Sequence, residues 1–117
     1  MLKYIFFIIS VLLFSACSNE SNTKKKSTSL QYNIVGMQGK MHFVYTALSD
    51  ADSFREIAYE ICAKDSICIV HFWNNKQLTP VSLPMSDEQV NAKVASYNYN
   101  KNTKLQRLLI CSVDGCN

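Results

Sequence analysis

The spacing of hydrophobic residues from position 30 onward predicts several strands. Positions 40–46 are rich in β-branched and aromatic residues, which is typical of a strand. Positions 67–73 are almost all apolar and predict a central strand covered on both faces. Positions 104–111 predict the last strand, and positions 31–37 predict a further one, turned by Gly36 and Gly39.

One helix is predicted after the strand at 40–46. Ser49 precedes Asp50, Ala51 and Asp52, which indicates a helix start with acidic residues in the first turn. The apolar residues that follow have helical spacing: Phe54, Ile57, Ala58, Ile61 and Cys62. This segment should therefore pack one face on the sheet.

A second helix is predicted after the strand at 67–73. Residues 74–76 form a turn, and residues 78–84 are extended because of Pro80 and Pro84. Ser86 and Gln89 then match a capping box. We expect the helix to run to about Tyr99 and to bury three residues: Val90, Val94 and Tyr97.

These elements predict a small two-layer α/β (α+β) sandwich. The order is strand, helix, strand, helix, strand, with three to four strands in the sheet and two helices on it. Residues 30–117 make up this single domain. A core of this size is marginal in stability without covalent cross-links, so the domain should be stapled by disulfides.

The first residues have the pattern of a cleaved signal peptide at 1–16. Lys3 precedes a mostly apolar run at 4–14, about half the roughly 20 residues that span a bilayer. The segment Leu13 to Cys17 resembles the lipobox of bacterial lipoproteins, with an apolar residue, small Ser15 and Ala16, and the cysteine. This resemblance implies cleavage before Cys17 and a lipid on its sulfur. The alternative is an ordinary signal peptide cleaved after Ala16, which leaves Cys17 free.

The resemblance also implies a location. A diacylglyceryl group supplies two chains, which is enough for stable membrane anchoring. Ser18 follows the cysteine, and by analogy with enterobacterial sorting this favours the outer membrane, facing the periplasm, in a Gram-negative host. We therefore predict a cell-envelope protein.

The charge of the chain lies mostly outside the predicted domain. The 117 residues carry a net charge of +3, yet residues 30–117 contain eight basic and eight acidic side chains. Residues 17–29 have no apolar residue after Cys17 and include Lys24, Lys25 and Lys26, so we expect a disordered basic tether. A neutral domain argues against nucleic acid as the partner.

Four cysteines remain when Cys17 is set aside. An even number in an exported chain indicates disulfides. Cys62 ends the first helix and Cys68 begins the next strand, while Cys111 and Cys116 enclose a turn-like tetrapeptide. We predict Cys62–Cys68 and Cys111–Cys116, with a crossed pairing between the last and middle strands as the alternative.

The chain from Phe54 to Cys111 is similar to a group of short exported bacterial proteins without assigned function. The resemblance rests on Ile61-Cys62, Cys68, Phe72-Trp73, Pro80 to Pro84, Met85-Ser86-Asp87, Ala95, Tyr97, Asn100 and Cys111. It covers about half of the chain and implies no activity.

The residues favour neither metal binding nor catalysis. Cys62, Cys68, His71 and Cys111 could form a zinc set, but no Cys-x2-Cys pair is present and disulfides compete for the sulfurs. His42 would be a neighbour of His71 if their strands pair, which would allow a shared metal or proton site. Ordinary sheet histidines are the commoner explanation. We predict no catalytic residues, no metal and no cofactor other than the lipid on Cys17.

Four residues are candidates for a binding surface. Trp73 and His71 lie on the strand at 67–73, and Tyr97 and Tyr99 lie late in the second helix, where at most one can face the core. For Trp73 a core position is the commoner role, and an exposed platform is the alternative. We predict a non-catalytic binding or protective module, or a subunit of an envelope complex, with a protein partner. The alternatives are a structural or stress-related envelope lipoprotein acting through Lys24 to Lys26, or a small periplasmic enzyme.

Overall fold

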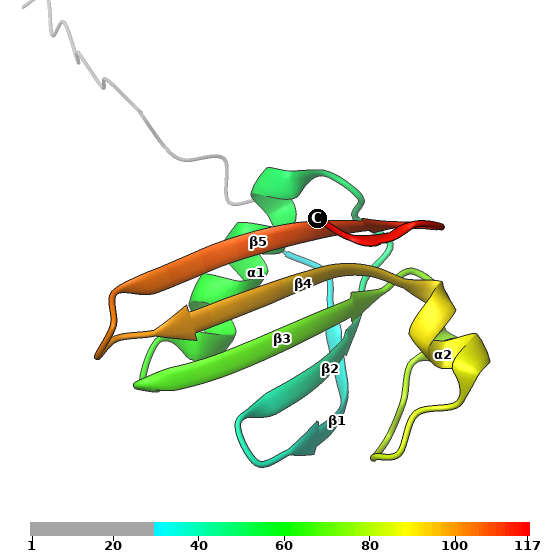
Figure 1. Ribbon diagram of the computed structural model, residues 1–117, viewed down its shortest axis with the longest axis horizontal. Helices are drawn as coiled ribbons and strands as arrows, with labels where there is room; N and C mark the ends of the chain where they lie inside the picture. The colour runs from blue at the N-terminus through cyan, green and yellow to red at the C-terminus, as the bar shows by residue number, and fades with distance from the viewer. Residues whose placement is uncertain (1–29) are drawn as a thin grey trace, which may run out of the picture.

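Six strands lie side by side in chain order in the computed structural model, which describes residues 30–117 (Figure 1). The strands are β1 (Asn33–Gln38), β2 (Met41–Tyr45), β3 (Ile67–Trp73), β4 (Lys93–Asn100), β5 (Leu105–Ser112) and β6 (Gly115–Cys116). β2 and β3 are parallel, and every other neighbouring pair is antiparallel. The helices are α1 (Ala51–Cys62), the 3-10 turn η1 (Lys76–Leu78) and α2 (Asp87–Ala92).

The predicted class of a sheet with helices is confirmed as an α+β domain with a mixed sheet, but three to four strands was too few. The strand expected at 31–37 is present as β1, and Gly39, with φ of +60°, turns it into β2. None of the helices in residues 30–117 is long and apolar enough to cross a membrane. The predicted signal peptide at 1–16, the lipidation site Cys17 and the tether at 17–29 lie outside the described residues.

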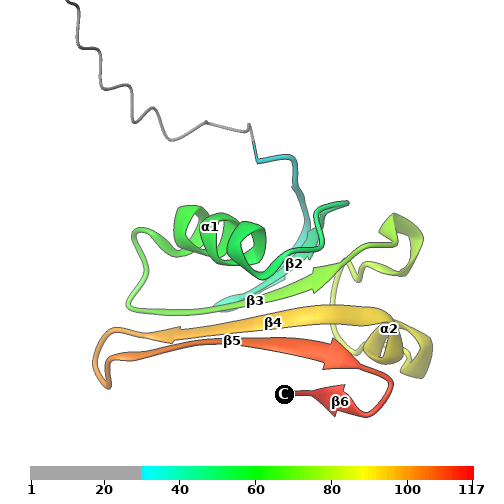
Figure 2. The same ribbon diagram turned by 90° about the horizontal axis from the view of Figure 1, so that it is seen from above.

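α1 covers one face of the sheet (Figure 2). Asp50 caps the helix: its carboxylate accepts a hydrogen bond of 3.0 Å from the Ser53 amide, so the cap is Asp50 and not Ser49. The predicted apolar face is buried at four positions: Phe54, Ile57, Ala58 and Cys62. This face packs on β3 and β4. Val70 of β3 and Tyr97 of β4 lie directly opposite each other and both belong to the core.

The predicted second helix is wrong beyond residue 92. The capping box at Ser86 and Gln89 is present, but α2 ends at Ala92 and the chain continues as β4. Val90, expected to be buried, is 49% exposed. β4 pairs in a hairpin with β5 and at long range with β3, from which residues 74–92 separate it, so its backbone hydrogen bonds join it to other strands. This long-range pairing outweighs the local helical spacing.

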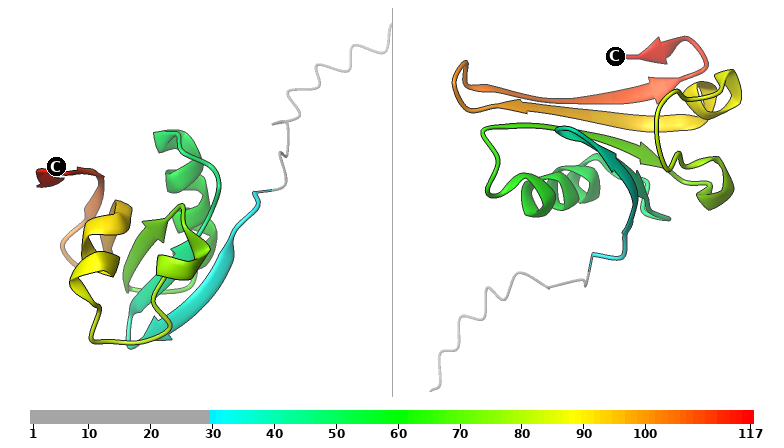
Figure 3. Two further views of the ribbon diagram at one scale, coloured as in Figure 1. Left: turned by 90° about the vertical axis from the view of Figure 1, so that its right-hand side faces the viewer. Right: turned by 90° about the horizontal axis from the view of Figure 1, so that it is seen from below.

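The segment from η1 to α2 closes one end of the other sheet face (Figure 3). Trp73 is fully buried there, and its indole Nε1 donates a hydrogen bond of 2.8 Å to the Gln89 carbonyl. Phe43 meets the indole edge to face, with ring centroids 6.0 Å apart. A side chain at Gly36 would collide with the backbone of Val81, so glycine is needed for this close approach.

Two disulfides have the predicted connectivity. Cys62–Cys68 joins the end of α1 to the start of β3, and Cys111–Cys116 closes the hairpin of β5 and β6. The crossed alternative is therefore wrong. Because Cys62 and Cys68 are both buried, the first bridge is part of the core beneath α1.

Candidate functional site

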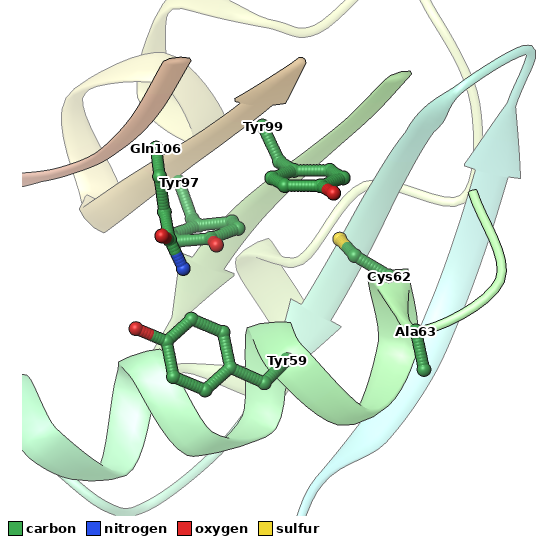
Figure 4. A pocket seen from close by; sticks show the side chains of 6 residues that line it. All are labelled: Tyr59, Cys62, Ala63, Tyr97, Tyr99 and Gln106. Carbon is green, nitrogen blue, oxygen red and sulfur yellow. The ribbon is translucent and has the colours of Figure 1, made fainter. Parts of the chain in front are cut away.

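A small hollow lies where α1 faces β4 and β5 (Figure 4). Its volume is about 210 Å³, and we call it the tyrosine hollow. It is lined by Tyr59, Cys62, Ala63, Tyr97, Tyr99 and Gln106. The Cys62–Cys68 disulfide fixes the end of α1 beside it, so one wall is covalently attached to the sheet.

Strand alternation places two of these tyrosines on the same wall. Tyr97 and Tyr99 are two residues apart on β4, and successive side chains of a strand point to opposite faces. Both rings therefore point toward α1, as Figure 4 shows. The expectation that at most one of them faces the core was wrong because it assumed a helix at this position.

The remaining polar groups come from the elements on either side. Tyr59 of α1 is 48% exposed and meets Tyr97 edge to face, with centroids 6.0 Å apart. Gln106 of β5 is placed by pairing with Tyr99 across the two strands. Burial raises the pKa of Tyr97, while a hydrogen bond with the Gln106 side chain lowers it. The phenol therefore stays protonated at neutral pH.

These lining residues are typical of a binding site rather than of a catalytic site. Tyrosine rings supply rigid apolar contact, and their hydroxyls, together with an amide, supply hydrogen bonds. The volume of about 210 Å³ is below the roughly 300–1,000 Å³ of typical small-molecule pockets. The tyrosine hollow has room for a single side chain or ring, so a larger partner would have to extend beyond it.

The four residues predicted as a binding surface do not come together. Trp73 is fully buried and Tyr97 is 2% exposed, so neither offers an exposed platform; Trp73 is the core residue that was the other interpretation. His71 and Trp73 lie on the sheet face opposite Tyr97 and Tyr99, because Val70 pairs with Tyr97 and the flanking positions point away. The two tyrosines share one site, and His71 meets Trp73 edge to face on the other side of the sheet, with ring centroids 6.2 Å apart.

The two histidines are also on opposite faces. β2 and β3 do pair, but His42 lies opposite Val70 and His71 lies opposite Phe43. Side chains at successive positions along the strands point to opposite faces of the sheet, so a site shared by both imidazole rings is excluded. The zinc set is excluded in the same way, since His71 faces away from Cys68 and Cys111 is bonded to Cys116.

His71 contacts Ser96 on the far face. Its Nδ1 is 2.9 Å from the hydroxyl oxygen of Ser96, which lies directly across on β4. Burial lowers the pKa of His71 to about 4, and the positive charge of Lys93 acts in the same direction. In the described part of the chain no ion pair joins His71 to a carboxylate. The ring is therefore neutral at neutral pH.

Replacing His71 with asparagine should make the domain less sensitive to acid. The unfolded chain binds a proton at a pKa of about 6.5, whereas folded His71 does so only at about 4. Stability therefore falls as the pH drops through this window, and the loss is complete below the folded pKa. Between about pH 7 and pH 4 we expect the wild type to lose about 2–3 kcal/mol more than His71→Asn. Urea titrations at several pH values measure this, and parallel profiles would contradict it.

A second hollow lies at the end of the molecule that carries α2. It is lined by residues of α2, the start of β4 and the β5–β6 hairpin, among them Val90, Lys93 and Val113. Its outer wall is a hairpin whose last strand has two residues, and Val113 is fully exposed. The Cys111–Cys116 disulfide closes this wall, and the lining contains no aromatic side chain.

Sequence reasoning missed Tyr59 and Gln106. Tyr59 follows Ala58 at the edge of the apolar stripe of α1, and Gln106 is one of the polar positions of β5. The available signal was the alternation Tyr97-Asn98-Tyr99, which indicates a strand with both rings on one face. Comparison of the chain with protein-family models, with curated proteins and with solved structures finds no match in any of the three.

Proposed function

We propose that the protein is a non-catalytic binding module of the cell envelope, anchored through a lipid on Cys17, and that it binds a protein partner through the tyrosine hollow. The observation that carries the proposal is the gathering of three tyrosines and a glutamine from α1, β4 and β5 around one opening. The anchor and the envelope location rest on the sequence of residues 1–17 alone.

The size of the hollow supports a protein partner over a free small molecule. About 210 Å³ accommodates one inserted side chain, and binding energy at protein interfaces is concentrated where a few anchor residues fill such pockets. The half-exposed Tyr59 ring would contact that side chain at the rim. The exposed Gln106 amide would offer hydrogen bonds at the opening, and the buried Tyr97 ring would form the floor.

The alternative of a structural or stress-related lipoprotein depends on Lys24 to Lys26, which lie outside the described residues. Nothing in residues 30–117 favours it over binding.

Replacing Tyr59 with alanine should abolish partner binding and leave the fold intact. Because the ring is half exposed, the free energy of unfolding should fall by only about 1 kcal/mol. Tyr59 would contact the inserted side chain directly, and loss of such a contact residue typically costs at least 2 kcal/mol, so binding should weaken by about thirtyfold or more. Tagged full-length chains are isolated from envelopes in mild detergent, and bound proteins are quantified by isotope-labelled mass spectrometry.

Leu105→Ala is the matched control. Leu105 is 47% exposed, close to the value for Tyr59, but on β5 it points to the opposite face from its neighbour Gln106. The wild type and Leu105→Ala should retain the same partner in equal amounts, and Tyr59→Ala should lose it. Equal retention by all three chains would refute the proposed site.

A further inference from the structure

A group of metal-binding side chains lies beneath the end of α1, beside the Cys62–Cys68 disulfide. His42 of β2, Asp65 of the loop before β3 and Cys68 of β3 each place one ligand atom within 4.8 Å of the others. The sulfur of Cys62 is bonded to that of Cys68 and therefore belongs to the same group. Two sulfurs, an imidazole and a carboxylate thus share one small volume.

The histidine of this group lacks good partners. His42 is 8% exposed, and its buried Nδ1 makes no hydrogen bond with any residue in 30–117. Its Nε2 is 3.9 Å from the Asp65 carboxylate, which is beyond hydrogen-bonding distance. A buried polar atom without a partner destabilises a fold and is uncommon in native proteins. The His42 imidazole is therefore available to act as a metal ligand.

The disulfide determines whether the group can bind a metal. Thiolates are the metal-binding form of cysteine, and a disulfide supplies none. Reduction by a dithiol breaks the S–S bond, forms two cysteine thiols and converts the dithiol to its own disulfide. Metal binding then displaces the two thiol protons to solvent. Cys62 lines the tyrosine hollow, with its sulfur directed toward Tyr99 in Figure 4, which provides a route for the reductant.

We propose that reduction of Cys62–Cys68 by a dithiol creates a Zn²⁺ site formed by Cys62, Cys68, His42 and Asp65. Zn²⁺ prefers four ligands of this kind in tetrahedral geometry, with bonds of roughly 2.0–2.3 Å. Such bonds place ligand atoms about 3.3–3.8 Å apart, so the three atoms now within 4.8 Å need only small movements. The ion would hold the end of α1 to β3 in place of the disulfide.

Zinc titration of the reduced and oxidised forms tests the proposal. The full-length chain carries Cys17→Ser, Cys111→Ala and Cys116→Ala, so that Cys62 and Cys68 are the only cysteines that remain. It is reduced anaerobically and the reductant is removed, and Zn²⁺ is added in competition with a chromophoric chelator. We expect one Zn²⁺ per reduced chain and none per oxidised chain. Co²⁺ added to the reduced chain should give thiolate charge-transfer absorption and the strong visible bands of tetrahedral cobalt.

Single substitutions test the two other ligands. His42→Gln and Asp65→Asn should each weaken Zn²⁺ binding to the reduced chain by at least about tenfold, and His71→Gln, on the opposite face, should not. If His42→Gln fails to fold, Asp65→Asn decides the question, because that side chain is 32% exposed and lies in a loop. Equal affinity in Asp65→Asn and the parent, binding by the oxidised chain, or no binding by the folded reduced chain would each overturn the proposal.

Discussion

Replacing Trp73 with alanine should lower the free energy of unfolding by about 3–5 kcal/mol. The side chain is fully buried at the end of β3, between the sheet and the segment from η1 to α2. Its removal takes away the contact with Phe43 and leaves the Gln89 carbonyl without the indole donor. The segment that covers this end of the sheet would lose its hydrogen bond to β3.

Chemical denaturation followed by circular dichroism measures the effect, because Trp73 is the single tryptophan and fluorescence is lost with it. Trp73→Phe is the matched control. It retains most of the apolar volume and loses the hydrogen bond, so it should cost about 1–2 kcal/mol. A cost below about 1 kcal/mol for Trp73→Ala would show that the covering segment contributes little to the fold.

Removing the Cys62–Cys68 disulfide by replacing both residues with alanine should cost about 2–4 kcal/mol. The sequence separation is 6, and closing so short a loop contributes roughly 2 kcal/mol in the chain-entropy description. Cys68 is fully buried and Cys62 nearly so, so loss of their sulfurs also leaves a small cavity under α1.

The second disulfide supplies the comparison. Cys111 and Cys116 enclose a loop of similar length, with a separation of 5. They join β5 only to the two-residue β6 at the edge of the sheet, which can open without unfolding the core. Alanine at both positions should therefore cost less than about 1 kcal/mol of global stability. Equal losses for the two pairs, measured by urea denaturation, would show that the bridge beneath α1 has no special role.

The sequence predicted well where local pattern and tertiary structure agree. The apolar stripe of α1, the capping box at Ser86 and the two short-range disulfides depend on residues close in the chain, and each is present. β3 was predicted correctly because a run of seven mainly apolar residues is typical of a buried strand in a small domain.

Residues 93–100 could not be assigned in the same way. Val90, Val94 and Tyr97 have helical spacing after a valid cap, whereas Tyr97 and Tyr99 alternate as in a strand. Local pattern leaves the two readings open, and pairing with both β3 and β5 decides between them. This one error concealed the tyrosine hollow, because Tyr97 and Tyr99 share a face only on a strand.

The rest of the candidate site was beyond local reasoning. Tyr59 meets Tyr97 only because α1 lies across β4 and β5, and Gln106 lies beside Tyr99 because β5 pairs with β4. His42 and His71 were expected to be neighbours only if their strands pair; the strands do pair, but the register of β2 against β3 places His42 on the disulfide side of the sheet. The packing and pairing of distant elements thus determine which residues line the tyrosine hollow, and the register of β2 against β3 determines the face on which His42 lies.

Site-specific photo-crosslinking tests the central claim, that a partner binds at the tyrosine hollow. The photoreactive phenylalanine derivative p-benzoylphenylalanine is placed at Tyr59 or, as the control, at Leu105 in full-length chains, and intact cells are irradiated. Both positions are about half exposed, and Leu105 points to the sheet face opposite the one that Tyr59 and Gln106 share. We expect a discrete cross-linked protein from position 59 and none from position 105. No product from position 59, or the same product from both positions, would contradict binding at this site.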